Sequence, residues 1–263
     1  MQEVGRDLEC RVVTQTELQG EPGSRVQQER WRVPVESPLT LWVNHRRWVT
    51  LMCTPAAQRQ LALGFAYFAG LFQDLGQVLL LHDCPDDPNR MEMVLAHEVP
   101  DLPAGSLITS GCGQGVSPEQ VWPDYRVPKV SPWSPSQVRD AMRQLQEGSV
   151  IHRSVGGTHA SGLSDGHSML ALYEDIGRHN TVDKLMGHAL LVGQDTAGLA
   201  LVTSGRISSE MLYKAIRMRA SIVVSRTAPT DVAIEMAIRY GLTLIGYARG
   251  NRYTVFAGPN GSA

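Results

Sequence analysis

The second half of the chain alternates short apolar runs with segments of helical periodicity, and this alternation constrains the fold more than any other feature. The apolar runs, which we interpret as strands, are SMLALYEDIG, GLALVTSG, SIVVSR, LTLIGYA and RYTVFAG. The helices predicted between them are the segment with Val182, Leu185, Met186, Ala189 and Leu190 on one face, SEMLYKAIRMRA with Ser208 as N-cap, and DVAIEMAIRYG with Thr230 as N-cap. The pattern indicates an α/β fold with a largely parallel sheet covered by helices.

The first half is predicted to be rich in strands. PLTLWVNHRRWVTLMCTP indicates a β-hairpin that turns at Asn44 and His45, and RMEMVLAHEV and SLITSG indicate two further strands. Thr54 and Pro55 are expected to be the N-cap and first residue of a helix. The helical stripe that follows is interpreted as core and not as a cofactor site; its members are Leu61, Phe65, Phe68 and Phe72.

Residues 116–137 contain five prolines, so we do not expect a regular element there. We interpret this segment as a Pro-rich connection between a β-rich lobe that ends at about residue 115 and an α/β lobe at 138–263. A flap over the preceding glycine loop and a docking role for Trp122 and Trp133 remain alternatives. Residues 1–30 are expected to be an N-terminal extension that could add an edge strand.

The charge of the chain is distributed unevenly. The net charge is −2, but residues 201–263 hold eight Lys or Arg and three Asp or Glu, a balance of +5. Three segments in this region, TSGRISSE, SRTAPTD and YARGNR, each follow a predicted strand and carry an arginine. Ligands of open α/β sheets bind beyond the carboxyl ends of the strands, so a phosphate-bearing ligand is favoured over a merely solvated basic face. The small net charge gives no reason to expect nucleic acid as a partner.

No segment contains the run of about 18 apolar residues that a membrane span needs. The first ten residues, MQEVGRDLEC, lack the apolar core of a signal peptide. We therefore expect a cytoplasmic protein that does not bind a membrane. The four cysteines show no C-x-x-C pair, which argues against a bound metal and against a disulfide framework. Free thiols are then open to chemistry.

Cys112 stands between two glycines in SLITSGCGQG, where its neighbours have no side chains to bury it. A structural cysteine is normally packed among apolar groups, so a reactive, accessible thiol is the favoured interpretation. Its activation needs a base or stabilised thiolate, and His159 and His179 are candidate bases. An acyl-transfer hydrolase built on Cys112 has no recognisable local signature. A zinc deaminase is disfavoured because the required H-x-E and P-C-x-x-C patterns are missing.

The segment YEDIGRHNTVDKLMGHAL concentrates polar residues where a predicted strand gives way to a helix. Two interpretations stay open for its side chains. They form a buried polar network, or Arg178 or His179 reaches the ligand or Cys112. The residues concerned are Asp175, Arg178, His179, Asn180 and Asp183.

Several of these segments, in this order, resemble the formate dehydrogenase accessory sulfurtransferase family, also called FdhD/NarQ. They are PLTLWVNHRRWVTLMCTP, LALGFAYFAGLF, GGTHASGL, EDIGRHNTVDKLMGHALL, VTSGRISSEMLYKA, VSRTAPTDVA and IGYARGNRYTVF, and they span about residues 31–257. The resemblance implies a cytidine-deaminase-like three-layer α/β fold with a mixed sheet and no catalytic zinc, preceded here by the β-rich lobe. It also implies a homodimer.

The function implied by this resemblance is that of a sulfur carrier or sulfurtransferase. A cysteine desulfurase would load Cys112 with persulfide sulfur, which would pass to the molybdenum cofactor, bis(molybdopterin guanine dinucleotide), for formate dehydrogenase. The residues that match the family's cofactor-binding stretch are Tyr247, Ala248, Arg249, Gly250, Asn251 and Arg252. Arg206 is a further candidate for binding the cofactor, on the ground of its positive charge alone.

One position departs from the family pattern. Many members carry C-G-x-C in the sulfur loop, whereas Gly115 stands here in place of the second cysteine. A persulfide needs one protein sulfur, so the departure questions a two-thiol relay and leaves Cys112 as a carrier. It also motivates the alternative function, a non-catalytic chaperone that binds the cofactor for formate dehydrogenase.

Overall fold

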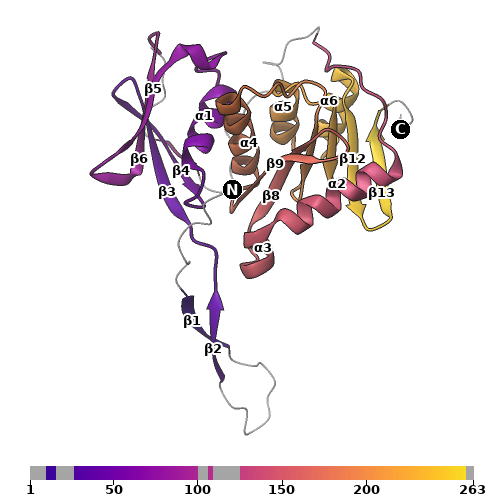
Figure 1. Cartoon of the computed structure of the whole chain (residues 1–263), viewed down its shortest axis with the longest axis horizontal. Helices are drawn as coiled ribbons and strands as arrows, with labels where there is room; N and C mark the ends of the chain where they lie inside the picture. The colour runs from indigo at the N-terminus through magenta and orange to yellow at the C-terminus, as the bar shows by residue number, and fades with distance from the viewer. Residues whose placement is uncertain (1–9, 16–26, 100–105, 109–124, 259–263) are drawn as a thin grey trace.

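The computed structural model describes residues 10–15, 27–99, 106–108 and 125–258, and these residues form three β-sheets with helices between and upon them (Figure 1). The strands are β1 (Cys10–Gln15), β2 (Gln27–Arg32), β3 (Ser37–Val43), β4 (Arg46–Cys53), β5 (Val78–Cys84), β6 (Asp87–Leu95), β7 (Ser106–Ile108), β8 (His159–Ser164), β9 (Met169–Asp175), β10 (Ala200–Thr203), β11 (Ile222–Ser225), β12 (Thr243–Arg249) and β13 (Arg252–Ala257). The helices are α1 (Gln58–Phe68), the 3-10 turn η1 (Leu75–Gln77), α2 (Pro135–Gly148), α3 (Val150–Val155), α4 (Arg178–Val192), α5 (Ser209–Arg217) and α6 (Asp231–Tyr240).

The six-stranded sheet has the order β13-β12-β11-β10-β8-β9 and is mixed. Only β10–β11 and β11–β12 pair in parallel, whereas β8–β10, β8–β9 and β12–β13 are antiparallel. The largely parallel sheet expected from the strand and helix pattern is therefore wrong, whereas the mixed sheet implied by the family resemblance is confirmed. Parallel neighbours need a long crossover, which only α5 and α6 supply, while β8–β9 and β12–β13 are joined by short turns that force antiparallel pairing.

Alternating side chains of this sheet build a three-layer core. Leu201, Val223 and Leu244 pack with α4, α5 and α6 on one face. Val202 and Val224 pack with α2 on the other face. Period-two alternation with both faces covered is what a central sheet between helices requires. The α/β architecture expected from the sequence is thus confirmed.

The five-stranded sheet has the order β5-β6-β3-β4-β7 and packs its apolar face on α1. The hairpin predicted at Asn44 and His45 is confirmed, since both have positive φ angles, 47° and 64°, as a tight two-residue turn demands. The aromatic stripe is core, as expected: Phe65 and Phe68 are buried on α1, and Phe72 is buried just beyond the end of the helix.

The start of α1 differs from the expectation. The helix begins at Gln58, preceded by Ala57 in the left-handed region, and not at Thr54 and Pro55. Thr54 instead binds the other lobe, because its backbone N donates to Asp175 and its hydroxyl accepts from the backbone N of Ile176. A long-range partner has taken the side chain that the local pattern assigned to helix capping.

Two boundaries also differ from the expectation. Of the N-terminal segment, the structure describes β1 and β2, which pair only with each other; neither is an edge strand of a larger sheet. Helix α2 begins at Pro135, inside the segment expected to be irregular, with a capping box between Ser134 and Gln137. The caps predicted for α5 and α6 are confirmed, since Ser208 and Thr230 accept from backbone N–H groups of the first turns.

Helices α1 and α4 cross at two glycines, and this crossing joins the two lobes (Figure 1). A Cβ atom on Gly64 would lie 1.8 Å from the backbone O of Asp183. One on Gly187 would lie 1.9 Å from the backbone O of Gln60. Hydrogen is therefore the largest substituent that the crossing admits at either position.

Within the described residues, the helices include none that is both long and apolar enough to cross a membrane.

Candidate functional site

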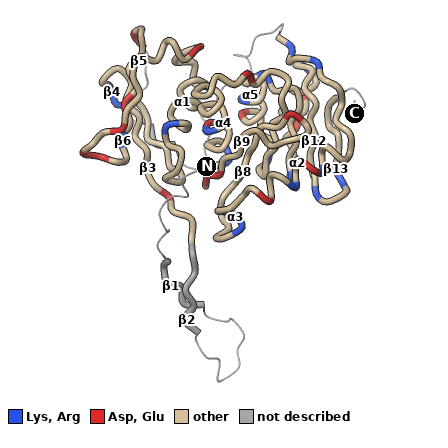
Figure 2. The backbone as a smooth tube through the Cα atoms, in the orientation of Figure 1, with Lys and Arg blue, Asp and Glu red and all other residues tan. Residues whose placement is uncertain are grey.

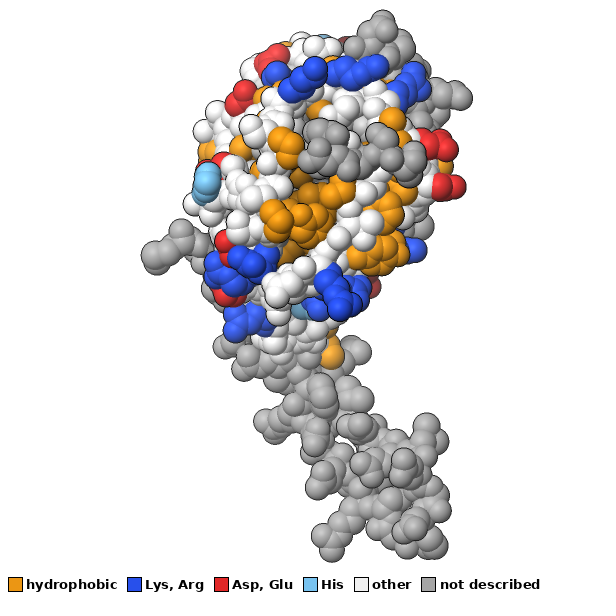
Figure 3. Space-filling view, turned by 90° about the vertical axis from the view of Figure 1, so that its right-hand side faces the viewer, with side chains coloured by type: hydrophobic (Ala, Val, Ile, Leu, Met, Phe, Trp, Pro, Cys, Tyr) orange, Lys and Arg blue, Asp and Glu red, His pale blue; other side chains and the backbone are white. Residues whose placement is uncertain are grey.

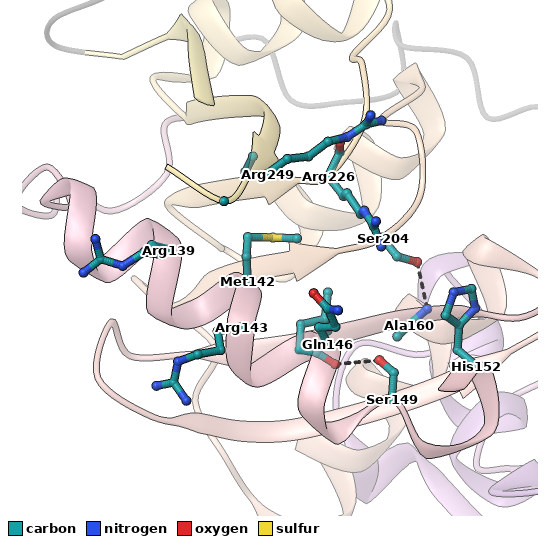
Figure 4. Close-up of a pocket in the computed structure, with 13 residues that line it drawn as sticks. Arg139, Met142, Arg143, Gln146, Ser149, His152, Ala160, Ser204, Arg226 and Arg249 are labelled. Atoms are coloured by element: carbon teal, nitrogen blue, oxygen red, sulfur yellow. Dashed lines mark hydrogen bonds between the residues drawn. The ribbon is translucent and has the colours of Figure 1, made fainter. Parts of the chain in front are cut away.

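The carboxyl ends of β10, β11 and β12, with the residues that come next, meet at one edge of the six-stranded sheet, because these strands are adjacent and parallel. They contribute Ser204, Arg226 and the run 248–250 to a pocket of about 330 Å³ (Figure 4). Arg249 Nε donates to the backbone O of Arg226 at 3.0 Å, which ties the second and third segments together. The carboxyl edge of the sheet thus carries a cavity, in the position where open α/β sheets bind ligands.

The opposite wall of this pocket comes from α2 and the residues after it, to which the sequence analysis assigned no role. Arg139, Met142 and Arg143 line the pocket from α2, and His152 lines it from α3. In Figure 4 the guanidinium groups of Arg139 and Arg143 extend away from the centre, along the rim. In the sequence, the one indication of this role was that Arg139 and Arg143 are spaced i, i+4 and so lie on the same side of an amphipathic helix. Sequence alone did not show which strands that helix faces.

The charged side chains that line the pocket are basic. They are Arg139, Arg143, Arg226, Arg249 and, when protonated, His152, and its described lining includes no Asp or Glu. Arg143 is partly compensated by Glu147 at 3.1 Å and Asp140 at 3.7 Å on the exposed side of α2. Arg252, which begins β13, adds one further arginine next to Arg249 at the end of β12, and Figure 2 shows the basic positions around this turn. The pocket is therefore suited to an anion.

The end of β12, the turn after it and the first residue of β13 carry the cofactor-binding stretch, residues 247–252, expected from the family resemblance. Tyr247 has φ 52° and Gly250 has φ 55°, and the register shifts between Gly246 and Arg249. A left-handed backbone is unusual for a residue with a large side chain such as Tyr247. Tyr247 is also 48% exposed. Its backbone N donates to the O of Thr227 at 3.1 Å, which holds this conformation.

The whole stretch lines one continuous region. Tyr247, Asn251 and Arg252 line a shallow hollow of about 650 Å³, and Arg252 and Asn251 also line a smaller one of about 220 Å³ against α2. Ala248, Arg249 and Gly250 line both the smaller hollow and the main pocket. Arg206 lies apart from these lining residues and acts electrostatically on Arg178 and His159.

Cys112 and Gly115 lie outside the described residues, as do Trp122 and the first part of the Pro-rich connection, residues 116–124. Among the cysteines whose side chains the structure describes, Cys53 and Cys84 are free. Burial raises the pKa of Cys53 to about 12, so its thiol stays protonated and unreactive.

The two candidate bases occupy different environments. His159 is half-buried with Nδ1 3.5 Å from the Ser204 hydroxyl, and burial together with Arg178 lowers its pKa. His179 is 5% exposed, and burial, with Lys214 and Arg178 nearby, lowers its pKa to about 3. An imidazole with so low a pKa accepts a proton from a thiol poorly, which disfavours His179 as the base for Cys112.

The polar segment at the start of α4 divides into two groups. Asp175 forms a fully buried ion pair with Lys184 at 2.6 Å and accepts from Asn180 Nδ2 at 2.8 Å. Asp183 forms a second buried pair, with Lys214 at 2.7 and 2.9 Å. These contacts support the structural interpretation for the acids and Asn180. Arg178 and His179 are not part of either pair.

A pH prediction follows from His179. The unfolded chain binds a proton at this position below about pH 6.5 and the folded chain does so only near pH 3, so folding stability falls as the pH decreases between these values. The glutamine variant His179→Gln lacks this titration. We expect the free energy of unfolding of the wild type, relative to the variant, to fall by about 1.4 kcal/mol for each pH unit between pH 6 and 4. Urea denaturation at several pH values measures this, and parallel pH profiles would contradict it.

Taken together, these features define a class: a two-lobed, mixed α/β protein with a basic, anion-accepting pocket at the carboxyl edge of its main sheet. Residues 34–262 match the model of the FdhD/NarQ family, and the chain belongs to that family.

Its relatives agree with this assignment. The chain is 33% identical over 235 residues to the "Sulfur carrier protein FdhD" of Halalkalibacterium halodurans, with 87% of each chain covered. It is 34% identical over 235 residues to the Bacillus subtilis protein of the same name, with 87% of this chain and 89% of that one covered. A solved structure, a "putative formate dehydrogenase accessory protein" from Desulfotalea psychrophila, superimposes with a TM-score of 0.74 at 25% identity, covering 94% of this chain and 98% of that one.

Proposed function

We propose that this protein is a sulfur carrier in the maturation of formate dehydrogenase. In this proposal, Cys112 accepts persulfide sulfur from a cysteine desulfurase and passes it to bis(molybdopterin guanine dinucleotide), which the protein binds as a substrate. Membership of the family and the names of the relatives support the carrier role. The name of the solved structure supports formate dehydrogenase as the recipient.

The observation that carries the cofactor part of the proposal is the arginine-lined pocket at the carboxyl edge of β10, β11 and β12. A cofactor with two pyrophosphates is a polyanion, and guanidinium groups bind phosphates through paired hydrogen bonds. The exposed Tyr247 ring stands beside this pocket and offers a face on which a purine base can stack.

The proposed loading step is a thiol–persulfide exchange. The Cys112 thiolate attacks the outer sulfur of the desulfurase persulfide, a new S–S bond forms on Cys112, and the desulfurase cysteine leaves as a thiolate. The exchange consumes no oxidant or reductant. Delivery to molybdenum returns the Cys112 thiol, and the reduction of sulfane sulfur to bound sulfide takes two electrons from the metal centre or from an external thiol. Because free thiols are required, the proposal places both steps in the reducing cytoplasm.

Intact mass spectrometry tests the carrier role directly. After incubation with an active cysteine desulfurase and cysteine, the wild type should gain the mass of sulfur, and a reductant should remove it. The Cys112→Ala variant should gain none, whereas Cys84→Ala should gain as much as the wild type. A wild type that stays unloaded by an active desulfurase would favour the non-catalytic cofactor-binding chaperone.

Binding of GDP, a fragment of the cofactor, tests the pocket. We expect Arg252→Ala to weaken GDP affinity about tenfold, since one charge-assisted hydrogen-bonding group to phosphate is lost. Arg59→Ala, at an exposed arginine paired with Asp83 on the other lobe, is the matched control and should bind as the wild type does. Isothermal titration calorimetry measures both, and equal affinity of the Arg252 variant would contradict the assignment.

The proposal includes a homodimer, which rests on the family resemblance. On the β13 side, Figure 3 shows an apolar strip between two groups of basic side chains, and β13 is the edge strand of its sheet. Such an edge offers backbone groups for pairing with a second chain. Sedimentation equilibrium measures the mass in solution, and a monomer at all concentrations would contradict this part.

A further inference from the structure

The start of α4 and the start of α5 converge on a group of basic side chains that lies beyond the pocket. Arg178 and His179 are the first two residues of α4, and Glu210 lies in the first turn of α5, 3.7 Å from His179 Nε2. Arg206 lies in the segment between β10 and α5, and His159 begins β8. Each helix start carries partial positive charge, so two of them add to the charge of the side chains.

The geometry of this group shows that its side chains are close together. A Cβ atom on Gly205 would lie 3.1 Å from Arg178 Cβ and 3.5 Å from His159 Nδ1. Gly205 does not have a positive φ angle, so its backbone conformation is open to any residue. A larger residue is excluded here because there is no space for its side chain. The missing side chain lets Arg178 and His159 lie against the segment after β10.

Buried polar side-chain atoms of this group have no hydrogen-bond partner among the residues that the structure describes. His179 is 5% exposed, and neither ring nitrogen has a hydrogen-bond partner among the described residues. Arg178 Nε is also buried and has no hydrogen-bond partner among the described residues. The first turn of α4 has Gly177 as N-cap, with no side-chain hydrogen bond to it. Leaving such groups unpaired is costly, and a bound ligand would satisfy them.

The charge balance indicates the kind of ligand. Lys214 is matched by Asp183 at 2.7 Å, and Asp175 is matched by Lys184, so neither pair contributes much net charge. Of the described charges here, Arg178, Arg206 and the two helix starts remain, against the acid Glu210. This surplus of positive charge and N–H donors is complementary to a small oxyanion.

We propose a binding site for a doubly charged oxyanion, such as phosphate, where α4 and α5 begin. Its residues are His159, Arg178, His179 and Arg206. The site adjoins the pocket through Ser204, which lines the pocket and lies 3.5 Å from His159. Its ligand is thus a free oxyanion or a phosphate of a molecule held in the pocket. The site goes beyond the proposed function, because it does not depend on sulfur transfer by Cys112.

Calorimetric titration of the full chain with inorganic phosphate at low salt tests the site. We expect saturable binding by the wild type, at least about tenfold weaker binding by Arg178→Gln, and wild-type affinity for the control Arg59→Gln. Phosphate should also raise the melting temperature of the wild type and the control more than that of Arg178→Gln. Failure of the wild type to bind, or equal binding by Arg178→Gln, would overturn the proposal.

A measurement on the wild type alone keeps the test independent of how the variants fold. Phosphate should shift the ring ¹⁵N resonances of His179 in the NMR spectrum, and unchanged resonances at saturating phosphate would overturn the assignment of this residue.

GDP separates the two sources of the oxyanion once phosphate binding is established. A parallel loss of GDP affinity in Arg178→Gln assigns the site to a phosphate of the pocket ligand, and retained GDP affinity assigns it to a free oxyanion.

Discussion

Cells that carry Cys112→Ala in place of the wild type are expected to lose formate dehydrogenase activity by at least about 100-fold. The physical reason is that a carrier without its only loop thiol has no atom on which to form the persulfide. Gly115 leaves no second cysteine in the loop to take over. Activity is measured in extracts of a strain that lacks the chromosomal gene and expresses each variant at equal level.

Cys84→Ala is the matched control for this experiment, because Cys84 is a partly exposed free cysteine on β5. It should support full activity. Cys53 is unsuitable, since it is completely buried and its replacement would open a cavity in the core. Full activity with Cys112→Ala would contradict the carrier role, and it would leave the cofactor-binding chaperone as the function to test.

Gly64→Ala and Gly187→Ala are each expected to lower the free energy of unfolding by about 3 kcal/mol or more. In both cases the new Cβ would lie less than 2 Å from a backbone oxygen of the facing helix. A backbone atom can withdraw only if α1 and α4 move apart, and this disturbs packing in both lobes. Urea denaturation of each variant and of the wild type measures the loss.

Gly148→Ala is the control for these glycine variants. At this last residue of α2, a Cβ would meet only the end of the flexible Leu172 side chain, at 2.8 Å. Helix propensity by itself favours alanine over glycine by about 1 kcal/mol. We therefore expect Gly148→Ala to change stability by no more than about 1 kcal/mol. Equal stability of all three variants would show that the α1–α4 crossing is looser than its distances indicate.

Local patterns were sufficient to predict most elements of the α/β lobe. The strands at β10 and β11 are short, fully buried apolar runs, and α5 and α6 start at Ser208 and Thr230, which cap them as predicted. Failures occurred where a distant residue competes with a local signal. Thr54 has the sequence of a helix cap, yet its hydrogen bonds go to Asp175 and Ile176, more than 100 positions away.

The candidate site shows the same division. The basic C-terminal stretch and its three arginine-bearing turns were visible in the sequence, because charge and strand order are local properties. The α2 wall of the pocket was not predicted, since nothing in Arg139 or Arg143 reveals which face of which sheet the helix covers. The role of Cys112 is still a prediction from the sequence and the family.

By itself, the sequence determined the family, the alternation of strands and helices, the basic end of the chain and the unusual setting of Cys112 among glycines. Only the tertiary structure decided which strands of the mixed sheet pair antiparallel, that α2 closes the pocket, and that Arg178 and His179 stand apart from two buried ion pairs. The reason is physical: periodicity and charge act along the chain, whereas burial, pairing direction and unmet hydrogen bonds depend on which distant segments come together.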